Sequence, residues 1–217
     1  MRGVAESILY IVLAYLIGSV PFGYLAGKIN GVDLREHGSH NIGATNAVRV
    51  LGKKWGIPVF ICDFLKGFLP LWWVKLQLGG EVVALSEGQM GLLLGTMLAL
   101  VLGHTFTCFL HFRGGKGVAT MAGCLVAFQP CVAMAAVGVF VVVLALSRYV
   151  SLSSMLAGVA MVAAAVVVYT EDGRVTAAEG MALGMLSLIL VLVVWKHRSN
   201  IVRICRGTES KVFSKKK

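Results

Sequence analysis

The stretch VATMAGCLVAFQPCVAMAAVGVFVVVLALS, residues 118–147, decides how the rest of the chain is arranged. As a single helix its 30 residues would extend ~45 Å, well beyond a hydrocarbon core of ~30 Å. It also contains Gln129-Pro130 near its middle, and proline disfavours helix in the residue that precedes it. We therefore predict two short helices that turn at Pro130.

The whole chain is apolar enough for a membrane. Of its 217 residues, 58% are hydrophobic and the mean hydropathy is +0.84, whereas soluble domains are nearer ~45–50% apolar. A bilayer span needs roughly 20 apolar residues as helix, and the long blocks here lack the period-2 alternation of barrel strands. We expect an all-α integral membrane protein with a single membrane domain over residues 1–217. The other apolar blocks lie at about 7–27, 55–78, 90–110, 151–169 and 178–195.

The distribution of charge predicts seven spans rather than six. With the break at Pro130, the basic segment 28–54 and the turn at Arg148 fall on one face. The acidic segment 170–179 falls on the other face, as the positive-inside rule expects. A six-span chain would place the basic tail, residues 196–217, outside. We therefore predict a seven-span helical bundle, N-terminus outside and C-terminus cytoplasmic, in which spans four and five are short.

Much of the net charge of +10 lies in that tail, where eight Lys and Arg residues stand against Glu209 alone. A basic segment beside a span suits the anionic lipid of the cytoplasmic surface. We predict a basic cytoplasmic tail over residues 196–217 that contacts the lipid bilayer, and no nucleic-acid partner. A basic tether for nucleic acid would explain the tail but not the polar stretch described next.

The first polar stretch is Gly38-Ser39-His40-Asn41-Ile42-Gly43-Ala44-Thr45-Asn46, followed by Arg49. It combines glycines, hydroxyls, amides and a guanidinium without one carboxylate. Glycines let the backbone approach a ligand, and N–H groups, hydroxyls and guanidinium all suit phosphate oxygens. The stretch therefore indicates an anion site. The alternative is an ordinary polar loop in which Asn and Ser satisfy turns.

The second polar stretch is Phe112-Arg113-Gly114-Gly115-Lys116-Gly117, which leads directly into the apolar block at Val118. Backbone N–H groups and the positive end of the helix dipole would face the ligand of Lys116. The stretch is typical of a phosphate cradle, but it is not a Walker A loop because Gly117 follows the lysine. The alternative is a basic cytoplasmic loop that merely obeys the positive-inside rule.

Some single polar residues are also candidates. His104 could be a general base, although a structural histidine is more common and no aspartate lies nearby in sequence. Asp63 and Lys66 would share a helix face and neutralise each other, which favours a structural role. His197 and Asn200 could face one site from a helix that leaves the bilayer, or could be a snorkelling flank.

Ser151 is equally ambiguous, because it could instead cap the span that follows it. The five cysteines include no CxxC pair, so we predict no metal site.

Four segments, taken together and in this order, resemble the bacterial acyl-phosphate-dependent glycerol-3-phosphate acyltransferases. They are GSHNIGATNAVRVLGKKWG (38–56), DFLKG (63–67), GH (103–104) followed by FRGGKGVAT (112–120), and KHRSNIVRICRGTE (196–209). The resemblance runs from Gly18 to about Glu209. It departs from the family where His40 replaces the usual glycine and where Thr105-Phe106-Thr107-Cys108 lacks an aromatic-proline pair.

The resemblance implies transfer of a fatty acyl group from acyl phosphate to the 1-hydroxyl of glycerol 3-phosphate, which yields lysophosphatidic acid and phosphate. The expected partners are these two substrates and the lipid bilayer, with no cofactor and with a monomer as the working form. The implied place is the bacterial cytoplasmic (inner) membrane, crossed several times, with the active site on the cytoplasmic face. No GxSxG elbow or His-x4-Asp motif is present, which argues against a covalent acyl-enzyme.

The resemblance also assigns residues to the two substrates. The expected acyl-phosphate ligands are Gly38, Ser39, Asn41, Gly43, Thr45, Asn46, Gly114, Gly115, Lys116 and Gly117. The expected glycerol-3-phosphate ligands are Arg49, Lys116, Ser151, His197 and Asn200. The catalytic candidates are Lys116, Ser39, Asn41 and His104, and the base is either a substrate phosphate or His104.

The rival hypothesis is a small transporter or channel for an anionic solute, with the glycine-rich loops as its gate. No inverted repeat is apparent, and charged residues do not recur through the span centres as an ion path would require. The sequence therefore favours the enzyme.

Overall fold

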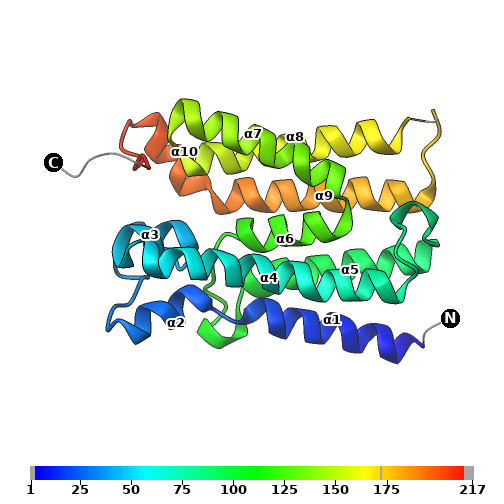
Figure 1. Ribbon diagram of the computed structural model, residues 1–217, viewed down its shortest axis with the longest axis horizontal. Coiled ribbons are helices and arrows are strands. Elements are labelled where there is room, and N and C mark those ends of the chain that lie inside the picture. Colours follow the sequence, from blue (N-terminus) through cyan, green and yellow to red (C-terminus); the bar gives the residue numbers. More distant parts are fainter. Residues whose placement is uncertain (1–2, 172, 213–217) are drawn as a thin grey trace. The chain divides into compact units, whose positions relative to one another are not determined.

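The computed structural model describes residues 3–171 and 173–212, and within these ranges all regular structure is helical. The end of the predicted tail, residues 213–217, lies outside the described residues, as does Asp172 of the predicted acidic segment. The chain divides into two compact units, and the boundary in the sequence lies between Phe128 and Gln129. Figure 1 shows the helices of each unit running roughly parallel or antiparallel to one another.

The first unit contains six α-helices and two short 3-10 turns. They are α1 (Val4–Ser19), α2 (Phe22–Ile29), α3 (Ala44–Leu51), α4 (Lys53–Gln77), η1 (Val82–Ala84), α5 (Glu87–Thr105), η2 (Cys108–Leu110) and α6 (Val118–Phe128). Helix α1 packs against α5, and α6 packs against α4. The second pair is very close, because a Cβ on Gly67 would collide with the backbone of Thr120 and one on Gly123 with that of Phe64.

The second unit is a three-helix layer followed by a short helix. It contains α7 (Pro130–Ser147), α8 (Val150–Tyr169), α9 (Ala177–Lys196) and α10 (Arg198–Cys205), with α8 packed against both α7 and α9. The tail returns to the turn between α7 and α8: the Val212 amide donates to the Arg148 carbonyl at 2.9 Å, and the Lys211 ammonium lies 5.3 Å from the Tyr149 ring centroid.

The predicted break in the stretch 118–147 is confirmed. Helix α6 ends at Phe128 and α7 begins with Pro130, which fits the first turn of a helix because the missing N–H would be unpaired there anyway.

Six helical segments among the described residues are long and apolar enough to cross a membrane, and α6, with 11 residues, is shorter. The six are Val4–Ile29, Lys53–Gln77, Glu87–Leu110, Pro130–Ser147, Val150–Tyr169 and Ala177–Lys196. Their outward side chains suit lipid, since Leu146 on α7 is 83% exposed and Val167 on α8 is 70% exposed. The chain is therefore an integral membrane protein.

Three interruptions of the first unit meet beside the middle of α4. The break after α1 is reached by Lys66, whose ammonium donates to the Val20 carbonyl at 2.8 Å. Helix α5 ends beside Asp63, and α6 begins beside Gly67. Side chains also pair with carbonyls at these breaks, since the Thr107 hydroxyl donates to the Ser19 carbonyl at 2.6 Å. Such internal pairing is what a chain break at membrane depth requires.

Candidate functional site

The first polar loop, residues 30–43, is organised by the buried side chain of Asn46 at the start of α3. The Asn46 amide nitrogen donates to the carbonyls of Leu34 at 3.1 Å, His37 at 3.0 Å and Asn41 at 2.8 Å. Its carbonyl oxygen accepts from the Ser39 N–H at 2.8 Å. Asn46 was predicted to bind the acyl phosphate, but the structure places its side chain inside the loop, where it sets the path of the backbone.

The rim of this loop carries the half-exposed or exposed candidates. Ser39 and Asn41 are partly exposed, and Thr45 is exposed in the first turn of α3. The Asn41 side-chain oxygen accepts from the Gly43 N–H at 2.8 Å, which forms an Asx turn directly before the helix. Gly38 has φ of 63°, in the left-handed region that glycine adopts without strain. The loop therefore offers hydroxyl, amide and backbone donors near a helix N-terminus.

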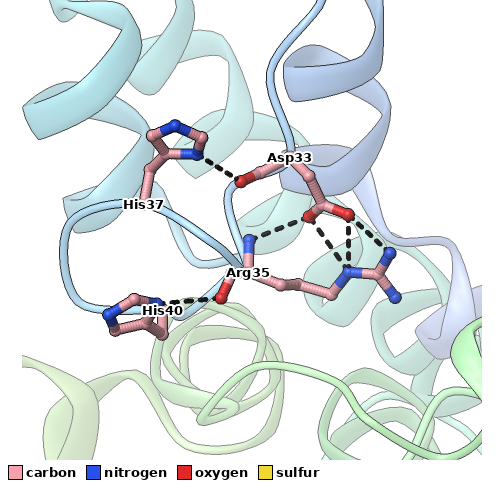
Figure 2. A network of polar contacts seen from close by, with 4 residues as sticks. All are labelled: Asp33, Arg35, His37 and His40. Atoms are coloured by element: carbon pink, nitrogen blue, oxygen red, sulfur yellow. Dashed lines mark hydrogen bonds and ion pairs between the residues drawn. The ribbon is translucent and has the colours of Figure 1, made fainter.

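Behind the rim, four residues form the network drawn in Figure 2. The Asp33 carboxylate accepts from the backbone N–H of Arg35 at 2.9 Å and from its guanidinium Nε at 3.0 Å. These donors hold the pKa of Asp33 below its usual range. His37 Nδ1 donates to the Asp33 carbonyl at 2.9 Å, and His40 Nδ1 donates to the Arg35 carbonyl at 3.0 Å. Carbonyls can only accept, so both rings carry the proton on Nδ1.

His40 occupies a left-handed conformation with φ of 57°. A residue other than glycine rarely adopts it, because Cβ approaches the following carbonyl. The hydrogen bond from the His40 ring to the Arg35 carbonyl closes the turn from within. This explains locally how a histidine can stand at a position where the resemblance noted in the sequence leads us to expect glycine.

The second polar loop, the glycine loop of residues 113–117, is attached to the end of α5. The Gly115 N–H donates to the His104 carbonyl at 3.0 Å, and the Gly114 N–H donates to the Thr105 carbonyl at 3.2 Å. A Cβ on Gly115 would collide with Nε2 of the His104 ring. Gly117 turns the chain with φ of 80° into α6, and the half-buried Lys116 lies between these glycines.

The ring of His104 also faces α4. His104 Nδ1 lies 3.5 Å from Oδ1 of Asp63, and the same oxygen lies 2.7 Å from the Lys66 ammonium. The predicted neutralisation of Asp63 by Lys66 is confirmed. The sequence offered no carboxylate beside His104, because Asp63 comes from another helix.

In the second unit, one carboxylate gathers three donors. Glu209 accepts from the Ser151 hydroxyl at 2.8 Å, from the Asn200 amide at 2.6 Å and from the Arg203 guanidinium at 2.7 Å. Burial alone would raise the pKa of Glu209, but the three donors outweigh it and keep the pKa below its usual value. Ser151 and Asn200, two of the predicted glycerol-3-phosphate ligands, thus donate to the same carboxylate. Glu209 was not predicted as a site residue.

His197 lies at the junction of α9 and α10, with only 2% of its surface exposed. Its Nδ1 donates to the Val193 carbonyl at 2.8 Å, which fixes the ring. The side chain of His197, like those of Ser151 and Asn200, is therefore held in a fixed orientation by a hydrogen bond within the protein.

Within the first unit, the structure places the remaining candidate Arg49 half-buried on α3. No group of three or more His, Cys, Asp or Glu side chains within residues 3–171 and 173–212 is arranged to hold a metal ion.

These features define the class: an integral membrane protein with two glycine-rich polar loops, which carry hydroxyls, amides and the cations Arg49 and Lys116. The family model described as "Glycerol-3-phosphate acyltransferase" matches residues 8–207. The chain belongs to this family, and it is therefore an acyltransferase.

Individual relatives match over nearly their whole length. The glycerol-3-phosphate acyltransferase of Acholeplasma laidlawii is 36% identical, with 96% of this chain and 94% of that chain covered. That of Geobacillus kaustophilus is 43% identical, with coverage of 94% and 95%. Glycerol-3-phosphate acyltransferase 3 of Bacillus anthracis is 44% identical, with 96% of each chain covered.

Solved structures agree. A crystal structure of PlsY (YgiH), an integral membrane glycerol 3-phosphate acyltransferase in its glycerol 3-phosphate form, superposes with a TM-score of 0.82 at 37% identity, covering 95% of each chain. The lysophosphatidic acid form of PlsY gives a TM-score of 0.79 at 36% identity with the same coverage.

Proposed function

We propose that this glycerol-3-phosphate acyltransferase takes its acyl group from acyl phosphate and transfers it to the 1-hydroxyl of glycerol 3-phosphate, releasing lysophosphatidic acid and phosphate. The observation that carries the proposal is the family match over residues 8–207, which includes both polar loops. Structures of the similar PlsY in glycerol 3-phosphate and lysophosphatidic acid forms support the acceptor and the product.

The donor phosphate is assigned to the two loops of the first unit. Ser39, Asn41 and Thr45 supply side-chain donors, and Gly114, Gly115 and Gly117 let the loop backbone come close to the phosphate. The N–H groups of Gly114 and Gly115 themselves donate to carbonyls at the end of α5. Lys116 lies between the donor phosphate and the acceptor phosphate, where it neutralises both charges. Asn46 contributes indirectly, since its side chain holds the first loop in shape.

The acceptor is assigned to Arg49, Lys116, Ser151, His197 and Asn200. Glu209 arranges two of these, because its carboxylate accepts from both Ser151 and Asn200. Donors that are already oriented lose little entropy when glycerol 3-phosphate binds, which favours affinity.

The chemistry needs little from the protein beyond position and charge. The 1-hydroxyl oxygen attacks the acyl carbon, a new ester C–O bond forms, and the bond from the acyl carbon to the phosphate oxygen breaks. Phosphate leaves with that electron pair. The hydroxyl proton goes to a substrate phosphate or to His104. No acyl-enzyme forms.

We also propose seven spans, with α6 as the short fourth, the N-terminus outside and the loops and tail on the cytoplasmic face of the inner membrane. The support is the alternation of charge along the chain and the break before Pro130. A monomer that forms one membrane domain over residues 1–217 completes the proposal.

The direct test follows lysophosphatidic acid formation by the purified, lipid-reconstituted protein with acyl phosphate, and with acyl-CoA as the control donor. We expect lysophosphatidic acid to form with acyl phosphate as the donor and not with acyl-CoA. Lysophosphatidic acid formation with acyl-CoA but not with acyl phosphate would contradict the donor assignment. Donor-independent uptake of phosphate esters into proteoliposomes would instead support the transporter.

Replacement of Lys116 tests the site. Lys116→Ala removes a charge placed for both phosphates, so kcat should fall by roughly 10²–10³-fold. The matched control is Lys28→Ala, which removes an exposed lysine at the end of α2 and should leave turnover near the original rate. Near-normal transfer by Lys116→Ala would overturn the assignment.

A further inference from the structure

The proposed reaction gives no role to Asp63 and Lys66, two ionisable side chains buried in the middle of α4 next to His104, the candidate base on α5. Asp63, Lys66 and His104 are exposed by only 2%, 6% and 5%. Ionisable groups within membrane helices are costly and are usually retained for a function. A buried ion pair is itself weak evidence for stability, because apolar residues of similar volume often do as well. These side chains therefore need a role other than holding the bundle together.

Lys66 connects α4 to the break between α1 and α2. Its ammonium donates to the Val20 carbonyl at 2.8 Å, lies 2.7 Å from Asp63 Oδ1, and faces the Phe22 ring with 5.5 Å to the centroid. The Val20 carbonyl lies where the first span changes direction before Pro21. This carbonyl also accepts from the Phe22 N–H at 3.2 Å, so Lys66 adds a charged donor at the break between the two helices.

Asp63 connects the same position to His104. Its Oδ1 lies 3.5 Å from His104 Nδ1, so that edge of the ring is directed toward α4. Nε2, on the opposite edge, is directed at Gly115, at the point where a Cβ would otherwise stand. Asp63 therefore fixes the orientation of the His104 ring on one edge, and the opposite edge packs against the glycine loop at Gly115.

The glycine loop is attached to the same turn of α5. The last carbonyls of a helix lack partners within it, and here two of them, those of His104 and Thr105, accept from the N–H groups of Gly115 and Gly114. A shift of the His104 ring or of its carbonyl would therefore move the backbone on both sides of Lys116.

We propose that Asp63 and Lys66 are positioning residues that act through His104 to hold the glycine loop, and with it Lys116, in its binding geometry. Neither residue touches substrate. The kinetic consequence rests on the proposed function, whereas the ordering of the loop does not and can be measured without substrate.

The test uses the full chain in lipid nanodiscs, with Asp63→Asn and Lys66→Met as the variants. The control is Thr96→Val, because Thr96 is equally buried on α5 but its hydroxyl donates only within that helix, to Leu92 at 2.8 Å. Amide hydrogen exchange of residues 113–117, melting temperature, and kcat and KM for both substrates are measured for each protein.

In Asp63→Asn and in Lys66→Met, exchange in residues 113–117 should rise at least about tenfold, while exchange in α7–α9 stays unchanged. The value of kcat should fall about 10- to 100-fold, since small misplacements of a positioning group cost rates of this order. Thr96→Val should leave both quantities near their original values.

The double variant gives a second, independent reading. If the pair acts as one unit, Asp63→Asn combined with Lys66→Met should lose no more kcat than the worse single variant. Losses that multiply would overturn the proposal, as would unchanged exchange of residues 113–117 in folded single variants.

Gly115→Ala perturbs the contact between the glycine loop and His104 from the side of the loop. It replaces Asp63→Asn in the test if that variant does not fold. Its Cβ collides with His104 Nε2, so loop exchange and kcat should change as they do in Lys66→Met. Unchanged loop exchange and kcat in Gly115→Ala would contradict the proposal. If the protein shows no transfer from acyl phosphate at all, the proposed function fails, and the exchange data alone still decide whether the cluster orders the loop.

Discussion

At the scale of single residues, two polar side chains each hold several other polar groups in place. Asn46 joins four backbone positions, and Glu209 joins three side chains. Removing one partner from such an arrangement leaves the others unsatisfied, which costs more than the lost bond. The effects of substitution should therefore exceed what exposure alone suggests.

Glu209→Gln tests this at the proposed acceptor site. The neutral amide accepts more weakly and presents an N–H to donors, so Ser151 and Asn200 lose their alignment. KM for glycerol 3-phosphate should rise about tenfold, with KM for acyl phosphate unchanged. Steady-state kinetics with each substrate varied in turn measure this. The control is Glu36→Gln, an exposed carboxyl in the first loop.

The depressed pKa of Glu209 gives a pH prediction with a definite sign. A carboxyl whose pKa is lower when folded contributes stability that is present above its ordinary value of 4.5 and is lost as pH falls through the folded pKa. Binding of the tail to the turn at Arg148 should therefore weaken at a pH below 4.5. The protection of residues 207–212 from hydrogen exchange, relative to the intrinsic rate at each pH, should fall there in the original protein but change little in Glu209→Gln.

The left-handed His40 provides a third residue-scale prediction. His40→Ala keeps the unfavourable φ and loses the ring hydrogen bond to Arg35 seen in Figure 2, so it should destabilise the protein by about 1 kcal/mol or less. His40→Gly loses the same bond but relieves about 1–2 kcal/mol of backbone strain, and should be at least as stable as the original. Thermal unfolding orders the two variants, and a less stable His40→Gly would contradict this account.

At the scale of elements, the short helix α6 depends on α4 at both ends. Its first half packs backbone against backbone at Gly67, and its last carbonyls are capped by Lys75, whose ammonium donates to Ala127 at 3.1 Å and to Phe128 at 3.2 Å. A cation at a helix C-terminus also interacts favourably with the helix dipole. These contacts explain how 11 residues can form a defined helix in this unit.

Lys75→Met should therefore destabilise the first unit by about 1–3 kcal/mol, because two carbonyls lose a charged donor. Lys75→Arg retains a cation and should recover most of the loss. Thermal unfolding in detergent compares the two. Equal melting temperatures for Lys75→Met and the original protein would show that the cap is dispensable.

Several features of these elements follow from the sequence. Length and Pro130 together predict the break in the stretch 118–147, and the spacing of Asp63 and Lys66 predicts their pairing. The contact of His104 with Asp63 could not be predicted, since periodicity shows which residues share a helix face but not which faces meet. The role of Glu209 was not predicted for the same reason. Its carboxylate joins Ser151 and Asn200, which are 58 and 9 residues away in the chain.

At the scale of the whole molecule, the number of spans predicts which segments share a membrane face. The acidic segment at Glu81 and the tail at Cys205 fall on opposite faces in a seven-span chain and on the same face in a six-span chain. Both positions are exposed in the structure, which makes them accessible reporters.

Thiol labelling of intact cells tests the proposed topology. A membrane-impermeant maleimide should label Glu81→Cys from outside, in a background without other cysteines. A chain that retains only Cys205 should react only after the membrane is permeabilised. Labelling of Cys205 in intact cells would contradict the cytoplasmic tail and favour six spans.

The return of the chain to the turn between α7 and α8 has a consequence for genetics. Glu209 lies 13 positions beyond Lys196, the last residue of α9, yet its carboxylate orders Ser151, Asn200 and Arg203. A premature stop codon at any position from 197 to 209 would remove that carboxylate while it spares every membrane helix. Late nonsense alleles of this gene should therefore divide sharply, with the boundary between impaired and functional alleles at codons 209–212 rather than at the last span.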